Sequence, residues 1–504
     1  MSEFQHPRPA DAAEDLAAST VGPILSSSFL SIDHLFLSFF EEYKVPGLAW
    51  GIVDRSGLIH HGAHGVKNVV SQLAPTHSDI FRIASMTKSF TALCALHLRD
   101  LGKINLADHV MHWLPELNLQ TASSDAHAPI TIGDLLSMSS GLVEDDPWAD
   151  RQLALSQEAF LEVLSNGIGL DLVSATAFEY SNLGYAIVGM IIERAAGVPL
   201  SAVATEAIFD PLNMVATTWD LLASDPTRVV SGHSLCDGQW QVEPLLGDGA
   251  FGAMGGLGST IEDLARWVAL HLNAWATPQQ LGASVKSSTL REMADIHRVM
   301  AQPRLTGPDL IAQGYGYGLM ITHHRLLGRV VGHSGGLPGY GSRMEWLPEY
   351  GIGIIALANR TYTPLTDVVR RALTLLVEEG FVTAPTRQPS LELQQVYEAV
   401  NDAYLDPERQ SLLQEAALPT YSLDRDDERR PPDLPSLRQT YGQLIATDPL
   451  IPTGSLRGHW NLRCQNGTLS VEVMLGPTTP HRLQFLKING DPAPDGVTED
   501  NQHR

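Results

Sequence analysis

The order of the predicted elements indicates an α+β fold: an antiparallel sheet flanked by helices, an all-helical lobe and a small C-terminal β-rich domain. Three observations predict it. A hairpin near the start is followed by a long helical stretch over residues 104–200, strands return between residues 328 and 357, and alternating strands follow residue 458. At 504 residues the chain is long for one hydrophobic core, so we expect more than one domain.

Residues 1–22 are polar and alanine-rich and are predicted to form a flexible N-terminal arm. Residues 23–382 are predicted to form the main domain, which opens with an amphipathic helix within residues 24–40. Its further elements are strands at 47–54 and 58–62, a helix from Ser85, strands at 328–331, 344–346 and 351–357, and a closing helix at 363–379.

The last part of the chain is predicted to have two sections. Residues 383–433 are interpreted as a helical linker region, because linker-like composition at 381–390 precedes a helical stretch at 391–418. Residues 434–504 are predicted to form the small β-rich domain, with strands at 458–464, 469–475 and 482–488.

The composition excludes several classes of partner. The net charge of −24 argues against nucleic acid or an anionic membrane, since both require basic patches. Three widely spaced cysteines, Cys94, Cys236 and Cys464, suggest neither a disulfide framework nor a zinc cluster. The N-terminus lacks the basic and apolar regions of a secretory signal, so we expect no membrane anchor and a cytoplasmic location.

The segment Ser85-Met86-Thr87-Lys88 carries the strongest chemical signal. Residues three apart on a helix lie on one face, so Ser85 and Lys88 would project together. A serine hydroxyl is a poor nucleophile until a base removes its proton, and a desolvated lysine is such a base. An isolated Ser-x-x-Lys match is weak, however, because a capping serine beside a solvated lysine has the same pattern.

Two further motifs follow in order: Tyr180-Ser181-Asn182, and His333-Ser334-Gly335-Gly336. Taken singly, Tyr180 reads as a core aromatic and His333 as a structural histidine. Together with Ser-x-x-Lys they resemble the three-part signature of the serine β-lactamase and penicillin-binding-protein superfamily. The chain is similar to the branch that contains class C β-lactamases, D-aminopeptidases, D-alanyl carboxypeptidases and related esterases. The resemblance extends over about residues 30–380.

The resemblance implies the β-lactamase/transpeptidase-like fold, with the nucleophile helix at the boundary between the lobes. It also implies an acyl-enzyme mechanism. Ser85 would attack a carbonyl carbon, while Lys88 and Tyr180 would move its proton. Tyr180 would then pass the proton to the leaving group and activate the deacylating water.

The same resemblance assigns the substrate-binding side of the site. Asn182 would bind a substrate amide, and His333, Ser334 and Gly335 would line the substrate. Backbone N–H groups of Ser85 and Gly336 would form the oxyanion hole. His333 stands where β-lactamases usually have lysine. Because a histidine is mostly neutral near pH 7, we expect esters, amides or peptides in preference to a carboxylate-bearing β-lactam.

One rival interpretation is the nucleophile elbow of α/β-hydrolases, since residues 332–336 also read Gly-x-Ser-x-Gly with Ser334 at the centre. That motif needs a following helix, which Pro338 and the neighbouring glycines oppose. Neither a metal nor a cofactor is expected. His60, His61 and His64 have no carboxylate or cysteine partners in a ligand pattern, and the glycine-rich segment 247–258 lacks Gly-Lys-(Ser/Thr).

The leading hypothesis is a serine hydrolase that acts through an acyl-serine on small esters, amides or D-amino acid peptides. Acyl transfer to an alcohol or amine is the second enzyme hypothesis, and β-lactamase activity is the third. A catalytically silent ligand-binding homologue is the non-enzyme alternative. The expected partner is a small-molecule or peptide substrate, while the natural acyl donor and the oligomeric state stay open.

Overall fold

The computed structural model describes residues 23–120, 129–276, 285–301, 309–383, 388–423 and 431–492. The predicted arm, residues 1–22, lies outside the described residues. The chain divides into two compact units, Met1–Thr383 and Ala384–Arg504, which are treated separately below.

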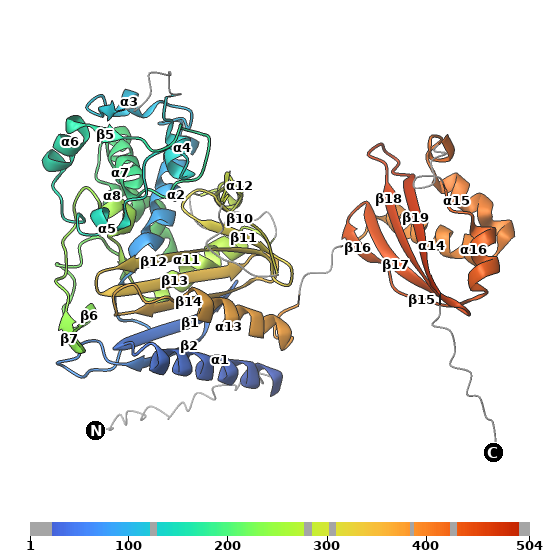
Figure 1. The fold of residues 1–504 in the computed structure, drawn as a ribbon, viewed down its shortest axis with the longest axis horizontal. Coiled ribbons are helices and arrows are strands. Elements are labelled where there is room, and N and C mark those ends of the chain that lie inside the picture. The colour runs from blue at the N-terminus through green and yellow to red at the C-terminus, as the bar shows by residue number, and fades with distance from the viewer. Residues whose placement is uncertain are drawn as a thin grey trace, which may run out of the picture. The chain divides into compact units, whose positions relative to one another are not determined.

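Unit 1 is built on an eight-stranded antiparallel sheet (Figure 1). The N-terminal strand β1 pairs with β2 on one side and with β14, the last strand of the unit, on the other. These two neighbouring strands, β1 and β14, are therefore separated by about 300 residues of chain. In the order in which they lie in the sheet, the strands are β2 (Gly57–Gly65), β1 (Gly47–Asp54), β14 (Ile352–Ala358), β13 (Tyr340–Leu347), β12 (Gly328–Leu337), β11 (Met320–His324), β10 (Leu310–Tyr315) and β9 (Arg298–Val299).

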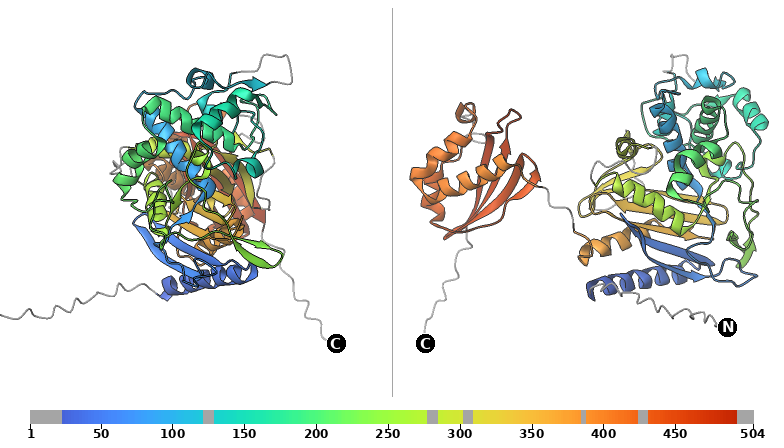
Figure 2. Two further views of the ribbon diagram at one scale, coloured as in Figure 1. Left: turned by 90° about the vertical axis from the view of Figure 1, so that its left-hand side faces the viewer. Right: turned by 180° about the vertical axis from the view of Figure 1, so that it is seen from behind.

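Both faces of this sheet are covered by helices (Figures 1 and 2). On one face α1 (Pro23–Glu42) and α13 (Thr366–Glu378) pack against Leu48, Trp50 and Ile52 of β1. On the other face α11 (Ile261–Asn273) packs against Ala49 and Val53. Alternate residues of β1 thus enter two different cores, as the period-2 geometry of a strand requires.

The helical lobe lies between the first hairpin and the returning strands in sequence. Its central helix α2 (Thr87–Asp100) packs against α7 (Asn182–Ala196), α8 (Leu200–Ala204) and α10 (Gly252–Gly255). The other helices of unit 1 are α3 (Val110–Trp113), α4 (Ile132–Leu136), α5 (Asp146–Ala149), α6 (Gln157–Asn166), α9 (Asp210–Leu212) and α12 (Ser287–Met293), with the helical turns η1 (Ala84–Met86) and η2 (Thr205–Phe209). Three two-stranded sheets join β3 (Phe81–Arg82) to β8 (Gly258–Ser259), β4 (Leu119–Gln120) to β5 (Ile168–Gly169), and β6 (His233–Cys236) to β7 (Gln239–Val242).

Among the described residues, no single helix has both the length and the apolar character needed to cross a membrane. One bent pair, Asn182–Ala196 with Leu200–Leu212, passes that test by length and composition only.

Unit 2 is a five-stranded antiparallel sheet with helices packed on it. Buried side chains of the helices and of the strands form one apolar cluster, in which Val400 and Tyr404 contact the core around Trp460 and Val471. The helices are α14 (Leu391–Leu405), α15 (Gln410–Ala416) and α16 (Leu434–Tyr441), with short turns η3 (Pro407–Arg409) and η4 (Tyr421–Leu423). The strands are β15 (Leu444–Thr447), β16 (Ile451–Gly454), β17 (Arg457–Cys464), β18 (Gly467–Leu475) and β19 (Leu483–Pro492).

The α+β fold class with a large antiparallel sheet and a helical lobe is confirmed. Sequence analysis divides the last section into a helical linker region, residues 383–433, and a β-rich domain, residues 434–504, but the described helices of the first part are not separate from the second. The helices α14 and α15 belong to the same compact unit as the strands and bury their apolar side chains on that sheet. The predicted main-domain boundary at residue 382 lies one residue before the observed one.

A buried charge cluster joins the sheet to α13. Glu345 on β13 is 1% exposed and receives bonds from Arg343 on the same strand and from Arg370 on α13, whose Nε lies 3.0 Å from Oε2. Burial alone would raise the pKa of Glu345, but the two guanidinium groups lower it from its usual 4.5 to about 2. The carboxylate is therefore held ionised inside the protein.

Replacing Glu345 by Gln should destabilise unit 1 by about 3–5 kcal/mol, because it leaves two buried guanidinium groups without a counter-charge. The wild-type contribution is present in full above pH 4.5 and is lost as the pH falls toward 2, since the folded pKa is the lower one. Urea unfolding at pH 7 and at pH 3 would measure both effects. The control Glu378→Gln removes an exposed ion pair with Arg371 and should cost under about 1 kcal/mol. Equal effects of the two variants would contradict this assignment.

Candidate active site

Ser85 and Lys88 lie together at the start of α2. Ser85 belongs to the 3₁₀ turn η1, and not to the α-helix as predicted, since the helix begins at Thr87. A 3₁₀ turn has three residues per turn, so residues three apart still share one side. Lys88 Nζ lies 3.0 Å from Ser85 Oγ. The η1 turn contacts β12, β13, α2 and α10, which places Ser85 between the sheet and the helical lobe as expected.

The turn that presents Ser85 is conformationally strained and firmly anchored. Ala84 has φ of +50°, in the left-handed region that non-glycine residues rarely adopt. The preceding residue, Ile83, is held from both sides. Its N–H donates to the Leu257 carbonyl at 2.9 Å, and its carbonyl accepts from Ser342 Oγ on β13 at 2.6 Å. These bonds fix the direction in which Ser85 leaves the turn.

Lys88 is completely buried, and its Nζ lies within hydrogen-bond distance of at least three oxygens. Apart from Ser85 Oγ, these include Asn182 Oδ1 at 2.6 Å and the Met254 carbonyl at 2.8 Å. The Met254 contact comes from the main chain of α10, so no side-chain pattern in the sequence could have indicated it. The two carbonyl oxygens thereby hold the Lys88 amine in place beside the Ser85 hydroxyl.

Two aspartates that sequence analysis missed hold Asn182 in place. Asp145 accepts the backbone N–H groups of Asn182 and Leu183 at 2.7 and 2.8 Å, and Asp146 Oδ1 accepts from Asn182 Nδ2 at 2.7 Å. Burial raises the pKa of Asp145, while these backbone bonds and Lys88 oppose the rise. The only sequence signal was the pair of acids before Pro147, a usual helix start.

Tyr180 comes just before the Ser181 N-cap of α7 and is 4% exposed. Lys88 Nζ lies 4.9 Å from the centroid of its ring, within the range of a cation–π contact. The ring also lies 6.3 Å from His333 and 6.4 Å from Tyr315, centroid to centroid. The structure therefore brings the buried Lys88, Tyr180 and Asn182 together with the partly exposed Ser85.

His333 is 1% exposed, and both of its ring nitrogens face protein groups. Nδ1 lies 2.5 Å from the Ser334 carbonyl, and Nε2 lies 3.0 Å from the Tyr315 hydroxyl. Because a carbonyl oxygen only accepts, Nδ1 carries a hydrogen. A direct bond from His333 to a substrate would require one of these contacts to be released. Tyr315, at the end of β10, was not predicted.

The strand β12 extends past its neighbour beside the nucleophile. β11 begins at Met320, which pairs with Gly332, so residues 333–337 continue beyond β11 and pack along η1. A Cβ on Gly335 would lie 2.2 Å from Ser342 Oγ and 2.4 Å from the Ile83 carbonyl. Only glycine permits this approach. Ser334 lies inside the continuous strand, which rules out the nucleophile elbow.

Tyr362, also unpredicted, flanks this strand. A Cβ on Gly336 would lie 2.7 Å from its Cδ1 atom, and its hydroxyl donates to Asp150 Oδ2 at 2.6 Å. The side chain is 49% exposed and its φ is +50°. Burial raises the pKa of Asp150 to about 6. Tyr362 thus forms an accessible wall next to the predicted oxyanion position.

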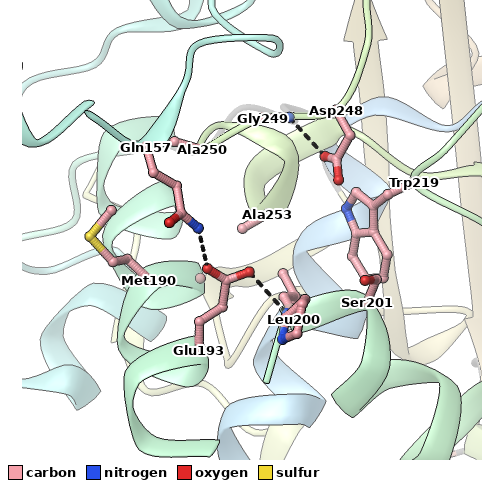
Figure 3. Close-up of a pocket in the computed structure, with 12 residues that line it drawn as sticks. Gln157, Met190, Glu193, Leu200, Ser201, Trp219, Asp248, Gly249, Ala250 and Ala253 are labelled. Atoms are coloured by element: carbon pink, nitrogen blue, oxygen red, sulfur yellow. Dashed lines mark hydrogen bonds between the residues drawn. The ribbon is translucent and has the colours of Figure 1, made fainter. Parts of the chain in front are cut away.

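A separate pocket lies on another side of α10, between α7 and α8 (Figure 3). One of its acids, Glu193, accepts from Gln157 Nε2 at 2.6 Å and from the Leu200 N–H at 3.0 Å, and another, Asp248, accepts from the Gly249 N–H at 3.0 Å. None of the predicted site residues lines this pocket. Its polar contacts serve to join helices, and we assign no chemistry to it.

Within the described residues, no group of three or more His, Cys, Asp or Glu side chains is arranged to hold a metal ion. Of the three histidines of β2, His60 has structural contacts: its Nε2 lies 2.7 Å from Asp33 Oδ1, and its ring stacks on Phe29 at 4.6 Å between centroids.

The chain is similar in sequence and fold to known proteins. The family model described as Beta-lactamase matches residues 32–379. "Beta-lactamase-like protein 2" of Dictyostelium discoideum is 28% identical over half of this chain, which spans about half (47%) of that relative. "Penicillin-binding protein 4*" of Bacillus subtilis is 25% identical over 65% of this chain and 70% of its own length.

Two solved structures share the fold. The octameric penicillin-binding protein homologue from Pyrococcus abyssi aligns with a TM-score of 0.61 at 22% identity, over 91% of this chain and all of its own. EstCE1, described as a hydrolase with promiscuous acyltransferase activity, aligns with a TM-score of 0.56 at 19% identity, over 69% of this chain and 98% of its own. The family model spans more than two thirds of the chain, and it shows that this protein belongs to the β-lactamase family.

Proposed function

We propose that the protein is a serine hydrolase that forms an acyl-serine at Ser85 and acts on small esters, amides or D-amino acid peptides. The observation that carries the proposal is the position of the buried Lys88 Nζ, which lies between Oγ of the partly exposed Ser85 and two carbonyl oxygens. Family membership supports hydrolase chemistry in general, and the choice among these substrates is our own.

The geometry suits Lys88 to a proton-transfer role. The Asn182 and Met254 carbonyl oxygens only accept, so they engage two N–H groups of Lys88 in either of its protonation states. The third position changes. As a neutral amine, Lys88 points its lone pair at the Ser85 hydroxyl and accepts that proton; as an ammonium, it donates back to the oxygen.

In the acylation step, the Ser85 Oγ–H proton passes to Lys88 and Oγ bonds to the substrate carbonyl carbon. The bond to the leaving group then breaks, and Tyr180 supplies a proton to that group. In deacylation, the deprotonated Tyr180 takes a proton from water as the water oxygen bonds to the same carbon. The bond from that carbon to Oγ then breaks, and the proton held by Lys88 returns to Oγ. Backbone N–H groups of Ser85 and Gly336 would bind the oxyanion, a contribution of about 3–4 kcal/mol for each such donor.

The surroundings of His333 support acyl substrates without a carboxylate. A histidine that is buried between Tyr315 and the Ser334 carbonyl does not offer the fixed positive charge that a lysine would offer there. The absence of that fixed charge disfavours an anionic substrate group at this position.

Acyl transfer is the second candidate. EstCE1, which shares the fold, is described as a hydrolase with promiscuous acyltransferase activity. An acyl-serine reacts with any nucleophile that enters the site, so the same residues would serve both reactions.

Incubation with an activated p-nitrophenyl ester should add one acyl group to the protein, and peptide mapping should locate it on Ser85. Intact-mass spectrometry of the wild type and of Ser85→Ala provides the measurement, and Ser334→Ala is the control that keeps the label. A label on Ser334 would contradict the proposed nucleophile. The absence of both adduct and nitrophenol release would instead favour the silent binding homologue.

Gly335→Ala should reduce the acylation rate constant about 100-fold, because the new Cβ pushes β12 away from η1 and misplaces Ser85 relative to the strand. Stopped-flow release of p-nitrophenol measures this rate. Gly169→Ala is the matched control, since a Cβ there meets nothing within 4 Å and the activity should be unchanged. Wild-type acylation by Gly335→Ala would show that the close approach of β12 is not required.

If deacylation limits turnover, addition of a primary alcohol should raise the rate of p-nitrophenol release and yield the new ester. Chromatographic measurement of ester against free acid separates transfer from hydrolysis. Acceleration without ester formation would exclude transfer.

Cephalosporin turnover by the wild type should be no faster than by Ser85→Ala, and faster turnover would restore the β-lactamase hypothesis.

A further inference from the structure

The carboxamide of Asn182 has an acceptor end and a donor end, and the site requires one orientation of it. Its Oδ1 faces Lys88 Nζ at 2.6 Å, and its Nδ2 faces Asp146 Oδ1 at 2.7 Å. Asn182 is completely buried, so water does not fix either end from outside.

Lys88 alone selects this orientation only while it is an ammonium. Once Lys88 is neutral, its lone pair would accept equally well from a flipped Asn182 amide, and would then be unavailable to the Ser85 proton. An ionised carboxylate only accepts hydrogen bonds. In the flipped orientation Asn182 Oδ1 would meet Asp146 Oδ1 without a hydrogen between them, which is unfavourable in a buried site.

Asp145 does not serve the same purpose. Both of its oxygens bind main-chain N–H groups, of Asn182 and Leu183, so it fixes the start of α7 and leaves the Asn182 side chain free to rotate. The two neighbouring acids therefore divide the work: one positions the backbone and the other positions the carboxamide.

We propose that Asp146 is a positioning residue, which keeps the Asn182 carbonyl turned toward Lys88 in both protonation states and so reserves the lysine lone pair for Ser85. The inference rests on the proposed acyl-serine function.

The kinetic test compares Asp146→Ala with Asp146→Asn in single-turnover acylation by a p-nitrophenyl ester. Asp146→Ala should lower the acylation rate constant about tenfold or more, a loss equivalent to one hydrogen bond to a charged group, and should change KM less than about twofold. Asp146→Asn retains a carbonyl acceptor and should recover most of the rate. Glu144→Ala removes the same charge from an exposed position on the same segment and should leave the rate unchanged.

The double variant Asp146→Ala/Asn182→Ala tests the coupling. In the Asn182→Ala background, loss of Asp146 should cost less than about twofold, because no carboxamide remains to be positioned. Equal losses in both backgrounds, a wild-type rate in Asp146→Ala, or an Asp146→Asn variant as slow as Asp146→Ala would each overturn the proposal.

A spectroscopic measurement separates this proposal from the proposed function. In ¹⁵N–¹H spectra, the Asn182 side-chain resonances are identified by their absence in Asn182→Ala. Asp146→Ala should accelerate hydrogen exchange of the Asn182 Nδ2 hydrogen that is bonded to Asp146 in the wild type, and Asp146→Asn should not. Unchanged exchange would overturn the positioning role even if Ser85 is acylated. Faster exchange in Asp146→Ala, in a protein whose Ser85 is never acylated, would refute the proposed hydrolase function but support the contact by which Asp146 orients Asn182.

Discussion

The arrangement of the site depends on one buried amine. Lys88 has no exposed surface, and an amine in such a place is tolerated only because oxygen atoms surround it. Those oxygens come from three separate parts of the chain: the adjoining turn, the start of α7 and the main chain of α10. The requirement to satisfy Lys88 therefore specifies how the helices of the lobe must meet, and it links stability of the lobe to the geometry of the site.

The sequence predicted the fold class. Its motifs also identified four candidate site residues that lie close together in the structure: Ser85, Lys88, Tyr180 and Asn182. Each has a side chain that carries recognisable chemistry at a recognisable spacing. The partners that hold them were not predictable in this way. Met254 acts through its carbonyl, which any residue possesses, and Asp145 and Asp146 resemble an ordinary helix start. The strand β10, which supplies Tyr315, was missed because Gln313 and Gly314 interrupt its apolar pattern.

The comparison of His333 with the position usually occupied by lysine shows how surroundings change the meaning of a motif. The sequence pattern suggested a group that faces the substrate, whereas the structure finds both ring nitrogens occupied by Tyr315 and Ser334. The rings of Tyr180, Tyr315 and His333 pack together and are buried. A hydrogen-bonded aromatic cluster thus takes the place of a lysine side chain that would point toward the substrate. The same three-residue motif can therefore serve a differently charged site.

The distances along the chain between the bonded groups have a consequence for folding. The bond from Lys88 to Ser85 spans three residues, whereas its bonds to Asn182 and Met254 span 94 and 166. The nucleophile and its amine can meet in a single early turn, but the amine gains its fixed carbonyls only after distant parts of the lobe have closed on it. Reactivity at Ser85 is thus a late property of the chain.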